Sequence, residues 1–345
     1  MEVSKIISKA GQLASVAKPI LVTGGAGRLG SRVVSHIGNS HAVQATSSTQ
    51  RSGYMHLSLD DSVKSMQKKI RDYSMVIHSA CLSKGTPDQI HEANVNGTKR
   101  IIQACRESDI PIMYISSAAS KIKGLSSEAT PYAHSKMEAE NYAIENGVPV
   151  ARVGVLVGDD KQATISLCNM AGMISRTLPS ISIRAQDSHI QPIDYESAAA
   201  CIRYMAEIML QNKNYNEVID IVGDPVSLNA FLDMINPSAI PLYVELDDLK
   251  ELAELINDGA FTLEFIELAK KDGETIKNDK LKDVLGSGFK TVTEIASEAR
   301  KEIGFTKTSG IARKILAGKC LSERRKIIEE VINLIRVSKR TGRLS

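Results

Sequence analysis

The chain has 345 residues and a net charge of +3, with 43 Lys and Arg against 40 Asp and Glu. This length allows one large or two ordinary domains with a buried core, and the balanced charge gives no reason to expect a nucleic-acid partner. Aromatic residues make up only 4% of the chain and Trp is absent, so a base-stacking surface is not expected.

The cysteines and the apolar stretches indicate the compartment. The five cysteines are odd in number and form no C-x-x-C pair, which favours a reducing compartment over a disulfide framework or a zinc site. No stretch approaches the ~20 apolar residues of a membrane span. Residues 1–18 lack the apolar core of a signal peptide and predict a short amphipathic helix. We therefore expect a cytoplasmic protein without a metal or a membrane span.

A glycine-rich turn joins the first expected strand to the first expected helix of the main domain. Ile20–Val22 is a short apolar run, residues 23–30 read TGGAGRLG, and Ser31–His36 continues with helical spacing. Both G-x-G-x-x-G and G-x-x-G-x-x-G can be read here. Glycines allow a tight turn, a close approach to a pyrophosphate and close helix packing, and the helix N-terminus attracts phosphate. The residues expected to contact a dinucleotide here are Thr23, Gly24, Gly25, Gly27, Arg28, Leu29 and Gly30.

The second expected strand, His41–Thr46, bears on which dinucleotide is bound. In NAD-binding folds an Asp or Glu at the end of this strand holds the adenosine ribose 2′-OH. No Asp or Glu occurs anywhere between Glu2 and Asp60. An acid at this position would repel the 2′-phosphate of NADP, so its absence favours NADP(H).

Hydroxyl and guanidinium groups stand where the acid would be. Ser47, Ser48 and Arg51 follow the strand, and Arg28 lies in the glycine turn. Such groups bind a phosphate well. The alternative is that both arginines are ordinary solvated surface residues. Further cofactor contacts are expected from Ser58, Leu59, Ser79, Ala80, Asn94 and Lys136.

Strands and helices continue to alternate after this point. Met75–His78 predicts a third strand, a helical stretch runs from Asn94 to Glu107, and Ile110–Ile115 predicts a further strand ending in Ser116 and Ser117. His78 reads either as a catalytic group or, more simply, as a hydrogen-bonded histidine near the cofactor. The alternation predicts a doubly wound parallel α/β sheet of the Rossmann type.

A tyrosine and a lysine follow at helical spacing. Tyr132 and Lys136 are four residues apart and would share one helix face. A nearby ammonium group lowers the pKa of a phenol towards the neutral range. A serine hydroxyl, expected from Ser117, would hydrogen-bond the substrate oxygen. These three residues form the expected catalytic set, although a Y-x-x-x-K pair alone is also compatible with an exposed helix surface.

Taken together, these motifs resemble the extended short-chain dehydrogenases/reductases of the NAD-dependent epimerase/dehydratase superfamily. TGGAGRLG, VIHSA, NVNGT, YISSA and YAHSK appear in that family's order over about the first half of the chain. The resemblance implies that Tyr132 is the general acid/base, Lys136 its partner, and Asn94 a structural or proton-relay residue. Ser117 and Tyr132 are only fifteen positions apart, which is short for the family, so Ser116 or Ser120 could fill the serine's role.

The second half is similar to the thioester reductases, which reduce acyl groups bound to coenzyme A or a carrier. Residues 149–158, the PIDY segment at 192–195 and IPLYVELDDLKELAELI from Ile240 carry this likeness. The resemblance implies reduction of an acyl thioester or other carbonyl, with an acyl carrier protein among the partners. Two alternatives stay open: a nucleotide-sugar epimerase, dehydratase or reductase using Arg152, Arg176 and Arg184, or an NADP-binding regulatory or scaffold protein.

These observations predict two domains. Residues 1–160 would bind NADP(H), with 189–223 returning to the same domain, and residues 161–188 and 224–345 would form a smaller, mainly helical substrate domain. An amphipathic helix near the C-terminus carries Ile328, Val331, Ile332 and Ile335 on one face. It would cover the substrate domain or dock a carrier or a second copy in a homodimer, and the basic tail after it would be solvated.

Overall fold

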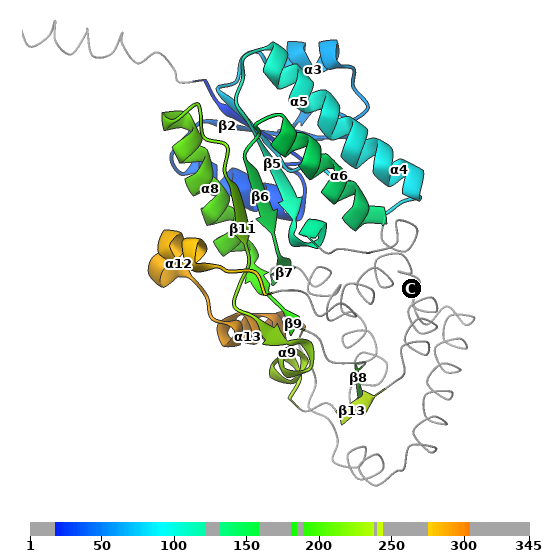
Figure 1. Cartoon of the computed structure of the whole chain (residues 1–345), viewed down its shortest axis with the longest axis vertical. Helices are drawn as coiled ribbons and strands as arrows, with labels where there is room; N and C mark the ends of the chain where they lie inside the picture. The colour runs from blue at the N-terminus through cyan, green and yellow to red at the C-terminus, as the bar shows by residue number, and fades with distance from the viewer. Residues whose placement is uncertain are drawn as a thin grey trace, which may run out of the picture.

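The computed structural model of the 345-residue chain describes residues 18–121, 131–158, 181–184, 189–237, 240–243 and 275–303 (Figure 1). Among these residues, no helix is both long and apolar enough to cross a membrane. The helices expected over residues 1–18 and around Ile328 lie outside the described residues, residue 18 excepted.

The centre of the molecule is a seven-stranded parallel sheet in the order β11-β6-β5-β4-β1-β2-β3. Strand order reverses between β1 and β4, which creates the crevice at the carboxyl ends of the strands where such sheets bind ligands. The strands are β1 (Ile20–Thr23), β2 (Val43–Ser47), β3 (Met55–His56), β4 (Met75–His78), β5 (Ile112–Ser117), β6 (Val150–Val153) and β11 (Val218–Ile221).

Helices cover both faces of this sheet (Figure 1). On one face, α2 (Arg28–Gly38) packs against α8 (Tyr195–Gln211). On the other face lie α3 (Val63–Ile70), α5 (Gly97–Glu107) and α6 (Pro131–Glu145). The short α4 (Pro87–His91) runs through a π-helical turn, η1 (Glu92–Asn96), into α5.

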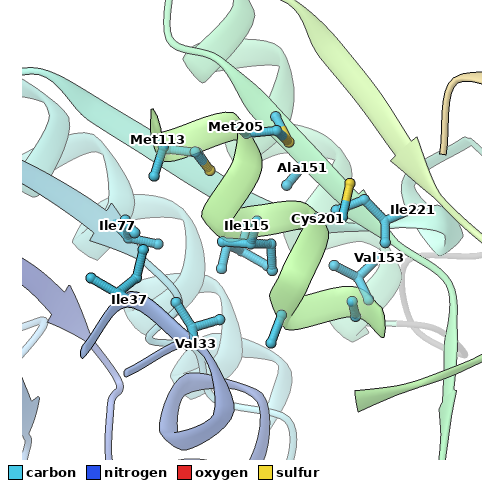
Figure 2. Packing of buried hydrophobic residues seen from close by; sticks show 14 of the residues in the cluster. Val33, Ile37, Ile77, Met113, Ile115, Ala151, Val153, Cys201, Met205 and Ile221 are labelled. Carbon is cyan, nitrogen blue, oxygen red and sulfur yellow. The ribbon is translucent and has the colours of Figure 1, made fainter. Parts of the chain in front are cut away.

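Two hydrophobic layers hold the helices to the sheet. Figure 2 shows Val33 and Ile37 of α2 and Met205 of α8 clustered with Ile77 and Ile115 of the sheet. The opposite layer takes the alternate strand residues, including Leu21, Val76 and Tyr114. Both faces of each central strand are therefore buried, which explains why these strands appear in the sequence as continuous apolar runs.

Smaller elements extend from the sheet edge near β6. β7 (Val155–Val157) pairs in parallel with β10 (Pro192–Asp194), β9 (His189–Ile190) pairs antiparallel with β12 (Val226–Ser227), and β8 (Ile181–Arg184) pairs in parallel with β13 (Ile240–Tyr243). A separate cluster joins Phe231 of α9 (Leu228–Ile235) to Ile295 of α13 (Val292–Ile303). In the sequence, α12 (Asp279–Leu285) and the 3-10 turn η3 (Gly286–Gly288) come after α9 and before α13.

The sheet confirms the doubly wound α/β class predicted from the sequence. Three boundaries differ in detail. The second strand begins at Val43 instead of His41, and β5 begins at Ile112 instead of Ile110. Asn94, the expected start of the following helix, lies in the π-helical turn before α5. The predicted domain boundaries stay a prediction, since much of the second half lies outside the described residues.

Candidate active site

The glycine turn is folded tightly between the ends of β1, β2 and β4. Gly24 has a φ of +66°, and a Cβ there would lie 2.7 Å from the backbone of Ala80. A Cβ on Gly30 would lie 2.1 Å from the carbonyl oxygen of Gly24, and one on Gly25 would lie 2.7 Å from the Cβ of Ala45. These contacts exclude a side chain at all three positions. The turn therefore holds its backbone against the sheet, as a pyrophosphate-binding loop requires.

The N-terminus of α2 opens directly from this turn. Its N-cap is Gly27, and no side chain in the described structure caps the helix. The first turn carries no acidic residue, and both Gly27 and Arg28 are exposed. The N–H groups and the positive end of the helix dipole are thus available to an anion. These features fit the diphosphate of a dinucleotide.

The end of β2 lies beside this helix N-terminus, because β1 pairs with β2 at Val22 and Ala45. Ser47 is buried, and its hydroxyl accepts a hydrogen bond from the amide of Thr49 at 3.2 Å. The exposed guanidinium of Arg51 lies 5.0 Å from the ring centre of Tyr54. The strand end thus presents hydroxyls and a cation where an NAD-binding site carries an acid.

The segments expected to flank the adenosine and the nicotinamide are also ordered by specific contacts. The carbonyl oxygen of Leu59 accepts hydrogen bonds from Arg100 Nε at 3.1 Å and Nη2 at 2.6 Å, and Gly97 packs on the Leu59 side chain. The amide of Ser58 donates to Asp61 at 3.0 Å. Ser79 and Ala80 are half-buried and follow β4 next to the glycine turn.

His78 at the end of β4 is a buried link between the turn and α5. Its Nδ1 lies 2.7 Å from the hydroxyl of Thr23, and its Nε2 lies 3.0 Å from the hydroxyl of Thr98. Burial, with a further contribution from the positive charge of Lys136, lowers the pKa of His78 to about 3. The imidazole is therefore neutral at physiological pH. This arrangement agrees with the simpler reading of His78 as a hydrogen-bonded residue and not as a proton donor to substrate.

Lys136 is buried beneath the carboxyl end of β5. Its Nζ donates to the carbonyl oxygen of Ile115 at 2.8 Å and to the hydroxyl of Tyr114 at 3.2 Å, and lies 4.7 Å from the Tyr114 ring centre. Burial lowers the pKa of Lys136, but Tyr114, Cys81 and Glu140 raise it more, so its pKa ends above the ordinary value. Burial has the opposite effect on Tyr114 and raises the pKa of its phenol.

Tyr132 lies on α6 one turn before Lys136 and is half-buried. Its carbonyl oxygen accepts a hydrogen bond from Ser135 at 2.7 Å, and Ser135 accepts one from the Asn94 side chain at 2.9 Å. The Asn94 side chain also exchanges two hydrogen bonds with the Leu82 backbone, at 2.6 and 2.9 Å. These three hydrogen bonds tie the Asn94 side chain to Leu82 and Ser135. The π-helical turn brings it there, as such turns often do near functional sites.

The three candidate serines differ in what their hydroxyls contact. Ser117, half-buried at the end of β5, accepts from the amide of Ala119 at 3.3 Å, which leaves its O–H able to donate. Ser120 donates to Glu140 at 2.7 Å and is therefore committed to a carboxylate. Ser116 is buried, and its hydroxyl has no partner among the described residues. Of the three, Ser117 has the contacts that best suit a donor to a substrate oxygen.

The sequence reasoning missed Tyr114 and Glu140. Tyr114 appears in the sequence as one more apolar residue of a strand, although its hydroxyl contacts Lys136. Glu140 lies four residues after Lys136 on the same face of α6 and is buried. A buried acid at helical spacing from the Y-x-x-x-K pair was the available signal, and it needed the helix to be placed first.

The strand order and the covering helices define an α/β protein with a Rossmann-like fold. Residues 20–148 match the model of the NAD dependent epimerase/dehydratase family. The resemblance to extended short-chain dehydrogenases/reductases is thereby confirmed. The likeness of the second half to thioester reductases stays a prediction.

Several solved structures share the fold of this chain. A putative epimerase from Burkholderia cenocepacia shares 18% identity, with 83% of this chain and 98% of that chain covered and a TM-score of 0.60. UDP-glucose-4-epimerase from Stenotrophomonas maltophila, with bound NAD and formylated UDP-arabinopyranose, shares 16% identity over 86% of this chain and 99% of that chain, with a TM-score of 0.59. UDP-N-acetylglucosamine 4-epimerase from Bacillus cereus shares 19% identity over 73% and 99%, with a TM-score of 0.53. The search of curated protein sequences finds no match.

Proposed function

We propose that this protein is an NADP(H)-dependent oxidoreductase that transfers hydride between the cofactor and a substrate carbonyl, with Tyr132 as general acid/base. One observation carries the proposal: a buried, charged Lys136 lies one helical turn from the half-buried Tyr132, at the edge of the sheet that bears the glycine turn. A purely structural lysine would gain little from this position, because burying an ammonium group is costly.

The bound cofactor would supply the hydride, and the chain would supply the proton and the electrostatic environment. The charge of Lys136 favours the phenolate of Tyr132, which brings the tyrosine pKa towards the working pH. Two of the three N–H donors of Lys136 are held by Ile115 and Tyr114. The remaining donor would bind the nicotinamide ribose. The Ser117 hydroxyl would donate to the carbonyl oxygen as negative charge develops there.

The choice of NADP(H) over NAD(H) rests on the acid-free end of β2. Ser47, Ser48 and Arg51, with Arg28 across the glycine turn, offer donors to a 2′-phosphate. A carboxylate at this position would instead bind the 2′-OH of NAD and repel that phosphate.

For the substrate we propose an acyl thioester, reduced to an aldehyde with release of the thiol. The support comes from the order of the second-half segments, of which the described part includes the β7–β10 pair and the α8 helix that follows Asp194. The segment from residue 244 to 256 lies outside the described residues. An acyl carrier protein or coenzyme A would then deliver the acyl group.

A nucleotide-sugar epimerase, dehydratase or reductase is the second candidate. Several proteins with this fold are nucleotide-sugar enzymes, including two UDP-sugar 4-epimerases. Of the three arginines considered for diphosphate contacts, Arg152 is engaged by Glu140 at 2.7 Å and Asp220 at 3.4 Å. Arg176 and the side chain of Arg184 lie outside the described residues. The loss of Arg152 from this set is the reason we place this candidate second.

A screen of NADPH oxidation against acyl-coenzyme A thioesters, simple aldehydes and nucleotide sugars tests the proposal. Oxidation with any carbonyl substrate supports hydride transfer, and the most active class identifies the substrate. Cofactor binding without turnover of any of these compounds would instead favour a regulatory or scaffold protein that binds NADP.

A further inference from the structure

A chain of ionic contacts lies beneath the turn that carries the candidate serine. The 3-10 turn η2 (Ala118–Lys121) follows β5 directly. Ser120 of this turn donates to Glu140 Oε2 at 2.7 Å, and Glu140 Oε1 accepts from Arg152 Nε at 2.7 Å. Glu140 belongs to α6 and Arg152 to β6, so the first two contacts already join three elements.

The contacts continue from Arg152 back to the same turn. Arg152 Nη1 lies 3.4 Å from Asp220 Oδ1 on β11, and Asp220 Oδ2 accepts from Lys121 Nζ at 3.3 Å. Two consecutive residues of η2, Ser120 and Lys121, are thus tied to opposite ends of one network. We call these five residues the η2 network: Ser120, Lys121, Glu140, Arg152 and Asp220.

The burial of the Glu140–Arg152 pair argues that the pair serves position more than stability. The side chains of Glu140 and Arg152 are 5% and 16% exposed. A buried ion pair often contributes no more to stability than apolar residues of similar volume, because desolvation offsets the attraction. Its paired charges do, however, accept only one arrangement of the attached backbones, because Arg152 must meet Glu140 and Asp220 together.

The network also reaches the proposed catalytic helix. Glu140 lies one turn after Lys136 on α6, two turns after Tyr132, and all three residues belong to the same 15-residue helix. The turn that begins after Ser117 is therefore tied by hydrogen bonding to the helix that carries the proposed proton donor. Ser117 and Tyr132 are only fifteen positions apart, so contacts from η2 to Glu140 would hold both ends of this short connection.

We propose that Glu140 and Arg152 are positioning residues that hold the Ser117 turn in register with Tyr132 and Lys136 for the hydride-transfer step. This inference rests on the proposed function for its catalytic consequence. Glu140 and Arg152 do not touch the substrate; they act through Ser120 and Lys121.

The cleanest test breaks the network without leaving a buried charge unpaired. Ser120→Ala removes the link from the turn to Glu140 while the Glu140–Arg152 pair remains. We expect kcat to fall about 10-fold to 100-fold, as for a small misplacement of a reacting group, with the Kd for NADPH changed less than twofold. Ser120→Thr keeps the hydroxyl and should restore kcat. Glu138→Gln is the matched control, because Glu138 lies on the same helix but pairs with Lys99 and His91 at the surface.

Hydrogen exchange of the free protein separates this inference from the proposed function. The amides of residues 117–121 include the Ala119 amide, which is hydrogen-bonded to Ser117. These amides should exchange faster in Ser120→Ala than in the wild type, and at the wild-type rate in Glu138→Gln. Unchanged exchange in Ser120→Ala, or faster exchange with kcat unchanged, would overturn the positioning role. If the wild-type protein reduces no carbonyl compound, the proposed function fails, and the exchange result alone supports or overturns the tie between turn and helix.

Discussion

The ammonium group of Lys136 donates to the carbonyl oxygen of Ile115 at 2.8 Å. This contact joins the middle of α6 to β5 two residues before Ser117. Since Tyr132 lies one helical turn earlier on α6, the same contact sets how far the proposed acid/base stands from the proposed serine. This hydrogen bond is thus one of the links between the helix that carries Tyr132 and the strand that ends in Ser117.

The first prediction concerns the proton donor. Tyr132→Phe removes the hydroxyl and should lower kcat about 100-fold or more, while the Kd for NADPH is retained. Lys136→Met should lower kcat and weaken the binding of NADPH, because the ammonium group would serve both the tyrosine and the ribose. Steady-state kinetics and cofactor fluorescence titration measure the two effects. Tyr142→Phe, on the same helix, is the control and should leave both unchanged; full activity in Tyr132→Phe would place the acid elsewhere.

The second prediction concerns cofactor choice. The acid-free end of β2 predicts tighter binding of NADPH than of NADH. Arg51→Ala or Arg28→Ala should weaken the binding of NADPH by ~1.5–3 kcal/mol, the usual range for a hydrogen bond to a charged group. The binding of NADH should be nearly unchanged. Fluorescence titration with both cofactors measures this. Arg71→Ala is the control, because Arg71 is exposed and pairs with Asp72 after α3; equal or tighter binding of NADH to the wild type would contradict the assignment.

The third prediction concerns stability at acid pH. His78 has a pKa of about 3 in the folded protein and about 6.5 when unfolded. Between these values the unfolded chain binds more protons, so stability falls as the pH decreases through this window. The loss from this group between pH 7 and pH 5 is about 2 kcal/mol.

Urea unfolding at the two pH values measures this loss. His78→Gln removes the titrating group and keeps polar atoms near Thr23 and Thr98, so its free energy of unfolding should fall less between pH 7 and pH 5 than that of the wild type. His91→Gln is the control, because His91 is exposed on α4, and it should keep the wild-type pH dependence. An unchanged pH dependence in His78→Gln would show that His78 is not buried in neutral form.

The central sheet could be predicted because its strands are local in the sequence. Met75–His78 is predicted and observed with the same limits, since a strand buried on both faces is a continuous apolar run. The glycine turn could also be predicted, because its residues are consecutive. The end of β5 was harder to predict from apolar character alone, because Ser116 and Ser117 are polar and yet pair with Arg152 and Val153 of β6.

The contacts that complete the candidate site could not be predicted in the same way. Tyr114 meets Lys136 across 22 positions of the chain, and Lys121 meets Asp220 across 99. Neither separation follows from helix or strand periodicity, because both depend on the order of strands in the sheet. The signals that would have helped were single buried polar residues at otherwise apolar positions, such as Glu140.

The fourth prediction concerns the substrate. Hydride attack on an acyl thioester forms a tetrahedral oxyanion, which Ser117 and Tyr132 would stabilise by hydrogen bonding. The C–S bond then breaks, and the thiolate leaves and takes up a proton while the acyl carbon becomes an aldehyde. One thiol should therefore appear for each NADPH that is oxidised in forming the aldehyde.

A thiol-reactive dye followed beside the absorbance of the reduced nicotinamide measures both quantities in one sample of protein and acyl-coenzyme A. Tyr132→Phe should slow the two signals equally, because it acts on the step they share, whereas thiol release by simple hydrolysis would continue without NADPH. Omitting NADPH is thus the control for hydrolysis. NADPH oxidation with sugar nucleotides or ketones, but no NADPH-dependent thiol release from any acyl thioester, would transfer the assignment to the nucleotide-sugar candidate or to a general carbonyl reductase, with the same Tyr132 and Lys136 chemistry acting on a different carbonyl.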